Sequence, residues 1–575
     1  MPVLVLDGRS RAAIETLQAL GRERVEVDVA AEPADCLAFH SRYARRKLRQ
    51  PPPSSPQAFL DWLGSLDQER GYELIVPCTE ASLLGLRAVP TDEPLRRKAI
   101  LPSNEALDTA LDKQKTWELA ARLDLRVPES VLIDSAEYIP RAEQFPVVLK
   151  PARSKLEVNG ELVTLAPAIV RDDATRRRWL ERWLPHTAVQ QQAYVAGRGL
   201  GVELLYDRGR PVWHFVHERI HEFPLTGGAS SYRRSVPADP KILADAQKLL
   251  DALEWHGVAM VEFKISAGAH WLMEINPRLW GSLALSIDAG VNFPLGLLQL
   301  ARGERPAPQP DYRCFYYTRD LATDLQWLKA NLKANHSDPL LLTQPRWMAF
   351  LEYARPLLGR ESWDHFDFRD LGITRRILQQ TLADQAGTLR RILAARRLHR
   401  RLIAHHKSLL RSRAPRERIL FLCYGNICRS PLAEHLAKQR FSGLHIESSG
   451  LHGRIEERSP AHMVRAARAL GVDLSQHRPA RVSKRQIEQA QLILVMDLEN
   501  YQALEKQFPE ALDRTTLLGL FARPPVVRIA DPLLASEEQA RRVAEQIRGS
   551  LEGLASWLPG EQPDRSPVSS RSNRT

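Results

Sequence analysis

The segment CYGNICRSP, residues 423–431, constrains the fold of this chain more than any other segment, and it follows a short apolar run. Five residues separate Cys423 from Arg429, and a loop of this length can fold around a tetrahedral dianion with its N–H groups pointing inward. Ser430 is a natural N-cap and Pro431 a natural first helical residue, so a helix is expected to begin here. A helix N-terminus favours bound anions and a cysteine thiolate. The segment therefore predicts an anion-binding loop between a strand and a helix.

Three further candidate strands end near polar side chains. They are residues 445–450 with Ser448, residues 492–497 with Asp497, and residues 526–530, which Asp531 follows. Ligands of a parallel α/β sheet bind outside the carboxyl ends of its strands, so these segments are expected to meet at one crevice. There the Cys423 thiolate is placed to attack phosphorus, and the Arg429 guanidinium to hold two phosphate oxygens.

These motifs resemble the low-molecular-weight protein tyrosine phosphatases over residues 417–558. The resemblance implies Cys423 as nucleophile, Arg429 as phosphate binder, and Asp531 as the general acid that later acts as a base. It also implies a supporting set around the loop: Asn426, Ser430, Ser448 and Asp497. The implied reaction is hydrolysis of a phosphorylated protein or of a small-molecule phosphoester, without a cofactor.

Relatives that cleave phosphotyrosine carry aromatic residues where this chain has Leu533, Leu534 and Arg454. The aromatic sandwich for a phenol ring is missing at these positions. A phosphosugar, phosphoarginine or another phosphoester therefore stays open beside phosphotyrosine. No cysteine lies beyond Cys428, which disfavours arsenate reduction by a thiol relay but allows a reversible disulfide with Cys423.

A second informative segment, GVAMVEFKISAGAHWLMEINPR at residues 257–278, predicts two strands joined by a turn at Gly268. This register places Glu262 opposite Glu274, with Asn276 on the same face. Facing carboxylates repel each other, and a divalent cation with oxygen ligands would remove that repulsion. The alternative is an exposed hairpin face with ordinary charges.

With this hairpin, and with lysines at a strand end and at a helix start, the chain resembles the ATP-grasp ligases. The resemblance implies a set of ligand contacts: Lys113, Lys150 and the Val195 backbone for ATP, Glu262, Glu274 and Asn276 for Mg²⁺ or Mn²⁺, and Arg278 for a carboxylate or its acyl phosphate. The implied reaction activates an unknown carboxylate with ATP, and an unknown amine then captures it. Nearby, Gly227, Gly228 and Ser230 form either an anion-binding loop or a plain glycine turn.

The charge of the chain is concentrated in one segment. Residues 389–418 hold eleven basic residues against the single acid Glu417, which accounts for most of the net charge of +12. Because the rest is nearly neutral, nucleic-acid binding is not expected. The segment also has an approximate apolar stripe, so it is expected to be a helix that joins two domains, with contact to an anionic membrane as the alternative.

We therefore expect a multidomain α/β protein. The expected domains are a pre-ATP-grasp α/β domain (1–105), an α+β ATP-grasp domain (106–305), a mostly helical extension (306–388), a basic helical linker (389–416), a parallel-sheet phosphatase domain (417–558) and a disordered tail (559–575). Five scattered cysteines, and no apolar run of roughly 18 residues, favour a cytoplasmic location. The expected function is bifunctional, a phosphatase joined to a carboxylate-amine ligase. The alternative is a phosphatase whose ATP-grasp unit is a nucleotide-binding sensor.

Overall fold

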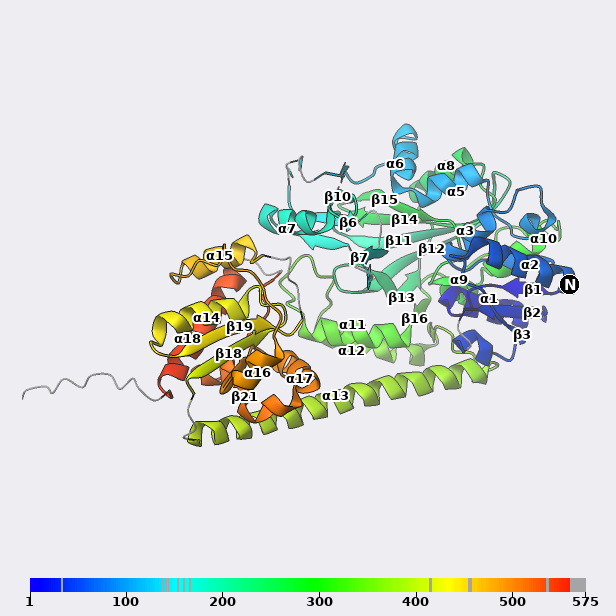
Figure 1. Ribbon diagram of the computed structural model, residues 1–575. Coiled ribbons are helices and arrows are strands. Elements are labelled where there is room, and N and C mark those ends of the chain that lie inside the picture. Colours follow the sequence, from blue (N-terminus) through cyan, green and yellow to red (C-terminus); the bar gives the residue numbers. More distant parts are fainter. Residues whose placement is uncertain are drawn as a thin grey trace, which may run out of the picture. The chain divides into compact units, whose positions relative to one another are not determined.

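A computed structural model describes residues 1–32, 35–135, 139–140, 142, 144–151, 155–158, 161–164, 167–412, 416–452, 458–533 and 537–558. The predicted polar tail, residues 559–575, lies outside the described residues. The chain divides into two compact units, Met1–Gln385 and Ala386–Thr575. The long helix α13, Leu371–Arg411, contains the boundary between them (Figure 1).

The N-terminal strands form a parallel sheet in the order β3-β2-β1-β4. The elements are β1 Val3–Val5, α1 Arg11–Arg22, β2 Val27–Ala31, η1 Leu37–His40, β3 Ala44–Arg49, α2 Pro56–Arg70, β4 Leu74–Val76, α3 Glu80–Arg87 and α4 Pro94–Arg97. Val3 and Val5 pack in one core with α1, whereas Leu4 packs with α2 on the other face. Both faces of this sheet are therefore covered by helices, as parallel sheets require.

The next sheet is antiparallel, in the order β5-β10-β6-β9. Its region comprises α5 Asn104–Leu111, α6 Lys113–Arg122, β5 Ser130–Ile133, β6 Val147–Pro151, β9 Ala168–Val170, α7 Asp173–Trp183, β10 Val189–Ala193 and the separate pair β7 Lys155–Val158 and β8 Glu161–Thr164. Leu180 and Trp183 of α7 pack against Leu149 of β6. Lys150 therefore points to the opposite face, because successive side chains of a strand alternate.

A seven-stranded sheet in the order β15-β14-β11-β12-β13-β16-β17 forms the centre of the first unit. Its elements are β11 Arg198–Asp207, β12 Arg210–Phe223, β13 Ala229–Ser235, α8 Pro240–Ala252, β14 Gly257–Ser266, β15 Ala269–Asn276, β16 Tyr317–Arg319, α11 Leu321–Lys333, α12 Arg346–Leu351, η2 Glu352–Leu358 and β17 Glu361–Trp363. The predicted helical extension thus also supplies β16 and β17. These strands have only three residues each, which is too short for a periodic signal in the sequence.

The predicted hairpin at residues 257–278 is β14 and β15. Ala267 and Gly268 have φ values of 50° and 78°, and a two-residue type I′ turn requires a positive φ at both positions. Glu262 pairs with Glu274, and Met260 pairs with Asn276. The observed register therefore agrees with the one that the sequence predicts.

Helices α9, Leu283–Ala289, and α10, Phe293–Ala301, follow the hairpin and are mostly buried. Within the described residues no single helix has the length and apolar character to cross a membrane, and α9 with α10 passes that test only as a pair bent by 87°. Leu283 and Leu298 pack in the same core as α1. This packing makes α9 and α10 core helices of the first unit.

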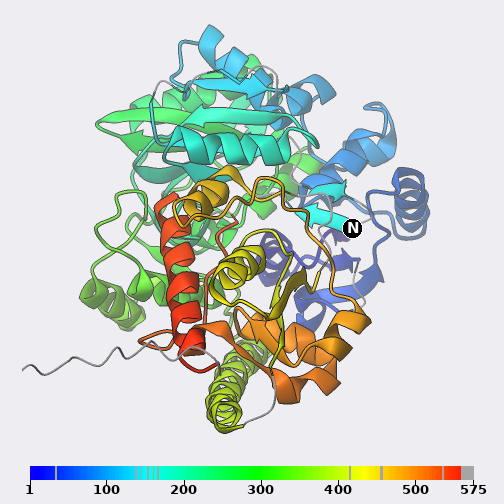
Figure 2. The same cartoon turned by 60° about the vertical axis from the view of Figure 1, so that its left-hand side comes forward.

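The second unit contains a parallel sheet in the order β19-β18-β20-β21, which Figure 2 shows with its helices. Its elements are β18 Arg418–Cys423, α14 Arg429–Arg440, β19 His445–Gly450, α15 Ala461–Arg468, α16 Lys484–Gln489, β20 Leu492–Val495, α17 Leu498–Gln507, η3 Pro509–Arg514, β21 Thr515–Leu517, η4 Leu518–Phe521 and α18 Glu537–Ala555. Ile419 and Phe421 pack on the side of α14 and α18, whereas Leu420 and Leu422 pack on the side of α17. The sheet therefore has helices on both faces.

One predicted strand of this unit is wrong. Residues 526–530 are irregular, and β21 at Thr515–Leu517 is the fourth strand instead. Val526 bonds to Gly519 and Ile529 to Met496 through single backbone hydrogen bonds that do not continue into a ladder. The preceding Pro524 and Pro525 lack N–H groups, which weakens strand pairing at this point.

The basic part of α13 packs on the second unit. Leu402 is buried in the core that contains Leu420 and Leu422, and Leu398 packs against that core. His406 is also buried and lies 3.1 Å from the Thr516 hydroxyl. The apolar stripe of the predicted linker helix therefore serves core packing.

Candidate active sites

The predicted anion-binding loop begins at the carboxyl end of β18. Cys423 is buried, and its Sγ lies 3.0 Å from the Ser430 hydroxyl. The Asn426 N–H donates to the same sulfur at 3.2 Å, and Asn426 adopts the left-handed conformation with φ 55°. Hydrogen bonds to sulfur from two sides stabilise a thiolate. The loop therefore holds Cys423 in a state suited to nucleophilic attack.

The Asn426 side chain fixes the loop from within. Its Nδ2 donates to Ser430 at 3.0 Å and to Ser448 at 2.8 Å, while its Oδ1 accepts from the Ala480 N–H at 3.0 Å. Ser448 in turn donates to Glu434 at 2.6 Å. The amide uses both of its hydrogens, so replacing it would leave buried hydroxyl groups without partners.

The end of the neighbouring strand β19 packs closely against the backbone of the anion-binding loop. A Cβ on Gly450, at the end of β19, would lie 2.8 Å from the backbone carbon of Gly425. Real Cβ atoms do not approach backbone so closely, so the loop needs glycine at position 450. Sequence reasoning did not single out this residue.

Arg429 opens helix α14 and is buried. Its Nη1 lies 2.5 Å from Asp497 and donates to the Ile529 carbonyl at 3.1 Å, while Nη2 lies 2.7 Å from Asp531. Burial works against the guanidinium charge, but Cys423 and the two aspartates outweigh it and raise the pKa of Arg429. The structure thus brings the predicted nucleophile, clamp and general acid together.

Asp531 lies at the mouth of this site. Its side chain is 47% exposed, whereas that of Asp497 is only 10% exposed. A bound phosphate dianion would compete with Asp531 for the Arg429 guanidinium. The exposed Asp531 carboxyl is therefore free to turn toward the leaving oxygen of a bound phosphoester.

An aromatic pair that sequence reasoning missed lies at the same mouth. Tyr424, directly after Cys423, is 44% exposed and stacks on His452 with ring centroids 4.4 Å apart. Leu533 packs against the core, while Leu534 and Arg454 lie outside the described residues. Leu533 thus supplies no aromatic ring, as the sequence indicates, but Tyr424 supplies an aromatic surface from another position.

The first unit contains a cavity of about 530 Å³ lined by the four-stranded sheet β5-β10-β6-β9 and by the seven-stranded sheet. It is lined by most of the predicted ATP-grasp residues: Lys150, Val195, Glu262, Glu274, Asn276 and Arg278. Lys113, at the start of α6, lies 2.8 Å from Glu274. The cavity therefore brings the predicted set together from four separate segments.

The carboxylate pair of the hairpin has two basic partners. Arg219 of β12 lies 2.6 Å from Glu262, and Lys113 pairs with Glu274. The Asn276 amide donates to Glu262 at 3.1 Å and to Glu274 at 3.4 Å. Arg219 carries no motif of its own, so the sequence did not indicate its position.

The two carboxyl groups differ in their tendency to ionise. Burial, reinforced by the neighbouring Glu274, raises the pKa of Glu262 despite Arg219. Burial also works against ionisation of Glu274, but Lys113 outweighs it and lowers the pKa of Glu274. These half-buried oxygen donors facing each other fit a divalent cation, because a cation would favour both ionised forms.

Lys150 faces the same part of the cavity. Burial, reinforced by the charge of Lys113, lowers its pKa to about 8. A lysine that is partly neutral without ligand gains its proton when a polyphosphate binds beside it. Lys150 is therefore a candidate phosphate contact whose charge depends on the ligand.

Other loops of the cavity have internal partners. The Val195 carbonyl accepts from Lys264 at 3.2 Å, so this carbonyl already has one donor. Gly227 and Gly228 line the cavity, and the Gly228 N–H donates to Glu222 at 3.2 Å. An anion at this loop would have to displace the Glu222 carboxylate, which favours the plain turn of the two predicted alternatives.

A second pair that sequence reasoning missed is Glu203 and His217. Both are buried on adjacent strands β11 and β12, and His217 Nδ1 lies 3.0 Å from Glu203. Burial raises the pKa of Glu203 well above its usual range and lowers the pKa of His217 well below its own. Both groups are therefore neutral, although the close nitrogen–oxygen contact has the geometry of an ion pair. His217 and Ser282 line the cavity, so a proton acceptor faces the ligand space.

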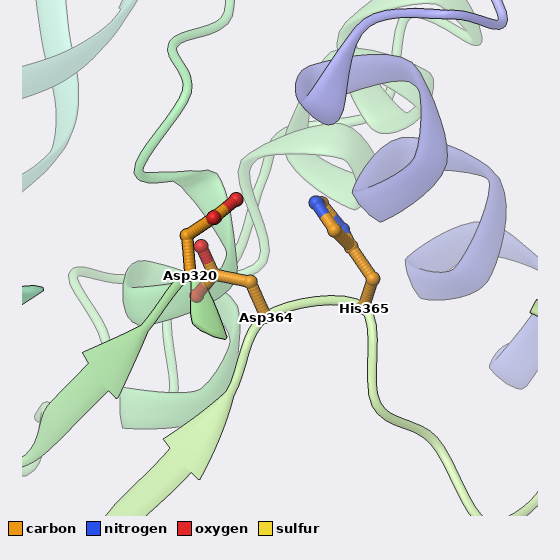
Figure 3. A group of neighbouring side chains, drawn as sticks. All are labelled: Asp320, Asp364 and His365. Carbon is orange, nitrogen blue, oxygen red and sulfur yellow. The ribbon is translucent and has the colours of Figure 1, made fainter. Parts of the chain in front are cut away.

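Figure 3 shows a further group, in which the Asp320, Asp364 and His365 side chains point toward one another. Each already has a partner of complementary charge: Arg11 for Asp320, Arg233 for Asp364, and Glu15 for His365. Burial raises the pKa of Asp364 despite Arg233, so this carboxyl is less ready than an exposed one to bind a metal ion. We therefore interpret this group as a buried ion-pair network within the first unit.

Comparison with known proteins gives a different family match for each of the two units. Residues 418–563 match the family model "Low molecular weight phosphotyrosine protein phosphatase". Residues 193–319 match the family model "ATP-grasp in the biosynthetic pathway with Ter operon". A solved L-amino acid ligase from Bacillus licheniformis is 14% identical with a TM-score of 0.41, and the match covers 55% of this chain and 78% of that chain.

Two curated relatives match the second unit. "Low molecular weight protein-tyrosine-phosphatase Ptp" of Acinetobacter johnsonii is 38% identical over 101 residues, which cover 18% of this chain and 71% of that protein. "Protein-arginine-phosphatase" of Geobacillus stearothermophilus is 30% identical over 146 residues, which cover 25% of this chain and 98% of that protein. Through its second unit, the chain therefore belongs to the low-molecular-weight protein tyrosine phosphatase family, and it joins that unit to an ATP-grasp unit.

Proposed function

We propose that the second unit hydrolyses phosphomonoesters through a cysteinyl phosphate. The observation that carries this proposal is the contact set around one sulfur: Cys423 bonded by Asn426 and Ser430, with Arg429 and Asp531 beside it. The Cys423 thiolate attacks phosphorus, and the bond from phosphorus to the leaving oxygen breaks. Asp531 donates a proton to that oxygen.

The second half of the reaction restores the enzyme. Asp531, now ionised, takes a proton from a water molecule as the water attacks phosphorus. The phosphorus–sulfur bond breaks, and the sulfur leaves as a thiolate that Ser430 and the Asn426 N–H stabilise. Arg429 holds two phosphate oxygens throughout, which stabilises the charge of both transition states.

The preferred leaving group is planar. The exposed Tyr424 ring, stacked on His452, supports a substrate whose phenol or guanidinium group can lie against it. The named relatives include a tyrosine phosphatase and an arginine phosphatase, and both substrates are planar at the phosphorylated group. A phosphorylated protein is therefore the proposed substrate.

A peptide panel tests this substrate class. Phosphotyrosine, phosphoarginine and phosphoserine peptides of one sequence are compared by kcat/KM with the full chain. The proposal predicts that a planar substrate exceeds phosphoserine by about tenfold or more, and that Tyr424→Ala reduces this preference. Equal rates for all three peptides would exclude a role for the aromatic pair, while Cys423→Ser controls for other phosphatases.

For the first unit we propose ATP-dependent joining of a carboxylate to an amine. Glu262, Glu274 and Asn276 would hold Mg²⁺ or Mn²⁺, and the cation would offset the negative charge of the ATP phosphates. Lys113 and Lys150 supply further positive charge in the cavity. A carboxylate oxygen attacks the γ-phosphorus of ATP, which forms an acyl phosphate and releases ADP. The amine nitrogen then attacks the acyl carbon, and phosphate leaves.

A metabolite screen tests this activity. Carboxylates and amines are offered in pairs with ATP and Mg²⁺ to the full chain, and the readouts are ADP release and product mass. Loss of ADP release in Glu262→Gln, with phosphatase activity unchanged, is the expected control result. Magnesium-dependent ATP binding without turnover across the screen would favour the alternative, a nucleotide sensor.

We also propose a cytoplasmic location, which the five cysteines without disulfide bonds support. The basic face of α13 supports electrostatic contact with an anionic membrane. Arg397, Arg400, Arg401, Lys407 and Arg411 are exposed, whereas Leu402 of the same helix is buried. Such contact weakens with salt, so the part of anionic-vesicle binding that Arg400→Glu/Arg401→Glu removes should fall steeply as ionic strength rises.

A further inference from the structure

Exposed apolar side chains gather in one short part of the first unit. Of eighteen large apolar side chains that are exposed in the described residues, ten lie between residues 347 and 382. They are Trp347, Met348, Phe350, Leu351, Leu357, Leu358, Phe368, Leu371, Leu378 and Leu382. Scattered exposed apolar residues are normal, but a concentration of this kind marks an interaction surface.

Helix α12 shows how these side chains are arranged. At about 100° per residue, Trp347, Met348, Phe350 and Leu351 occupy a continuous arc of about 160°. The opposite side of the helix holds Ala349, which is fully buried. Helix α12 is therefore anchored by one small residue and presents its large apolar residues outward.

The following segments continue this pattern. In η2, Leu357 and Leu358 are 89% and 73% exposed. At the start of α13, Leu371, Leu378 and Leu382 lie within about 40° of one another on the helix. The exposed faces of α12, η2 and the first turns of α13 are called the apolar surface below.

The exposed charged side chains of the same stretch are all basic. Arg346, Arg360, Arg369 and Arg375 are exposed. No acidic side chain of residues 345–383 is exposed. The acids Glu352, Glu361, Asp364 and Asp370 are buried, and Asp367 pairs with Arg22. The exposed charges of the apolar surface itself are therefore cationic, and the exposed Asp35 beside it pairs with Arg376 of α13.

We propose that the apolar surface docks on an anionic lipid bilayer. Tryptophan, phenylalanine and leucine side chains would enter the boundary between headgroups and acyl chains, while the arginines bind lipid phosphates. Peripheral docking suits short helices of this kind, since α12 has only six residues. The exposed charges of residues 345–383 are all cationic, which matches the phosphates of anionic lipids. The proposal does not rest on either catalytic activity.

Vesicle co-sedimentation of the full chain tests the proposal. Vesicles of phosphatidylcholine with about one third phosphatidylglycerol are compared with pure phosphatidylcholine vesicles. The variant Phe350→Ser/Leu351→Ser/Leu357→Ser should bind the anionic vesicles at least about tenfold more weakly than the unchanged chain. A matched control is Leu84→Ser/Leu132→Ser, whose side chains are 44% and 59% exposed outside the apolar surface and should leave binding unchanged.

Three further readouts make the outcome decisive. The thermal unfolding curve and p-nitrophenyl phosphate hydrolysis should be the same in the triple variant, which shows that it folds. The binding that the triple substitution removes should persist in high salt, whereas the contribution of the basic α13 residues should not. If Arg400→Glu/Arg401→Glu abolishes binding and the triple substitution does not, the proposal is overturned. It is also overturned if the triple substitution changes only the oligomeric state, since a second copy would then cover the surface.

Discussion

The two sites of this chain bind phosphate groups by different means. In the second unit, one continuous loop supplies the nucleophile, the clamp and the hydrogen-bond partners of the nucleophile. In the first unit, the cavity collects single residues from α6, β6, β12, β14 and β15, and its carboxylates are paired with Arg219 and Lys113. At the loop an anion competes with the Asp531 carboxylate for Arg429, whereas in the cavity a ligand must compete with two ion pairs on separate strands.

The largest expected effect tests whether the two sites work independently. Cys423→Ser should lower p-nitrophenyl phosphate hydrolysis by at least about 10³-fold, because serine lacks a comparably nucleophilic anion near neutral pH. ATP-dependent ADP release should be unchanged in the same variant. A parallel loss of ADP release would show that the two sites are coupled, which would contradict their independence.

The next effect concerns the general acid. Asp531→Asn should slow hydrolysis of phenyl phosphate by about 10²-fold or more, because phenol is a poor leaving group without a proton. Hydrolysis of p-nitrophenyl phosphate should fall much less, since p-nitrophenol leaves readily as an anion. The measurement is kcat for both substrates, and an equal loss for both would contradict the role of Asp531 as an acid.

The same difference explains how far the sequence predicts each site. The loop was predictable because Cys423, Asn426, Arg429 and Ser430 lie within eight residues, so local geometry fixes their relation. The Glu262 and Glu274 pair was predicted from a turn centred on Gly268; the observed turn is half a residue earlier, and a β-bulge after Glu262 restores the pairing. Arg219 was not predictable, because only the pairing of separate strands brings it to Glu262.

The remaining misses have the same physical origin. Glu203 and His217 meet across β11 and β12, and neither residue belongs to a spaced motif. The strand predicted at residues 526–530 failed because short apolar runs fit strands and buried loops equally well. Local chemistry is thus readable from the sequence, whereas contacts between strands distant in the chain require the fold.

A smaller effect tests the missed pair in the cavity. If His217 takes the proton of the attacking amine, His217→Asn should lower the ligation kcat by about 10- to 100-fold. The ATP dissociation constant should be unchanged, because the proposed ATP contacts are other residues. Rate measurements across pH should show that the loss is greatest where the unchanged chain is most active. A matching loss of ATP affinity would assign His217 a structural role.

The smallest expected effect concerns the proton that Lys150 gains when a polyphosphate binds in the cavity. Lys150 has a pKa of about 8, lowered first by burial and then by Lys113, so it loses its proton near this pH when no ligand is bound. A bound polyphosphate raises that pKa, and binding above pH 8 must therefore take up a proton. The ATP dissociation constant should rise with pH, approaching about tenfold per unit above this value.

Isothermal titration in buffers of different ionisation enthalpy measures that proton directly. Uptake should be absent well below pH 8, where Lys150 is already charged, and should approach one proton per ATP above it. Lys150→Arg is the matched control, since arginine stays protonated and its ATP affinity should lose this pH dependence. Because residues 423–431 contain no lysine, phosphate binding at the Cys423 loop should not share this transition. A pH transition that persisted in Lys150→Arg would show that another group in the cavity takes up the proton, and would contradict the role proposed for Lys150.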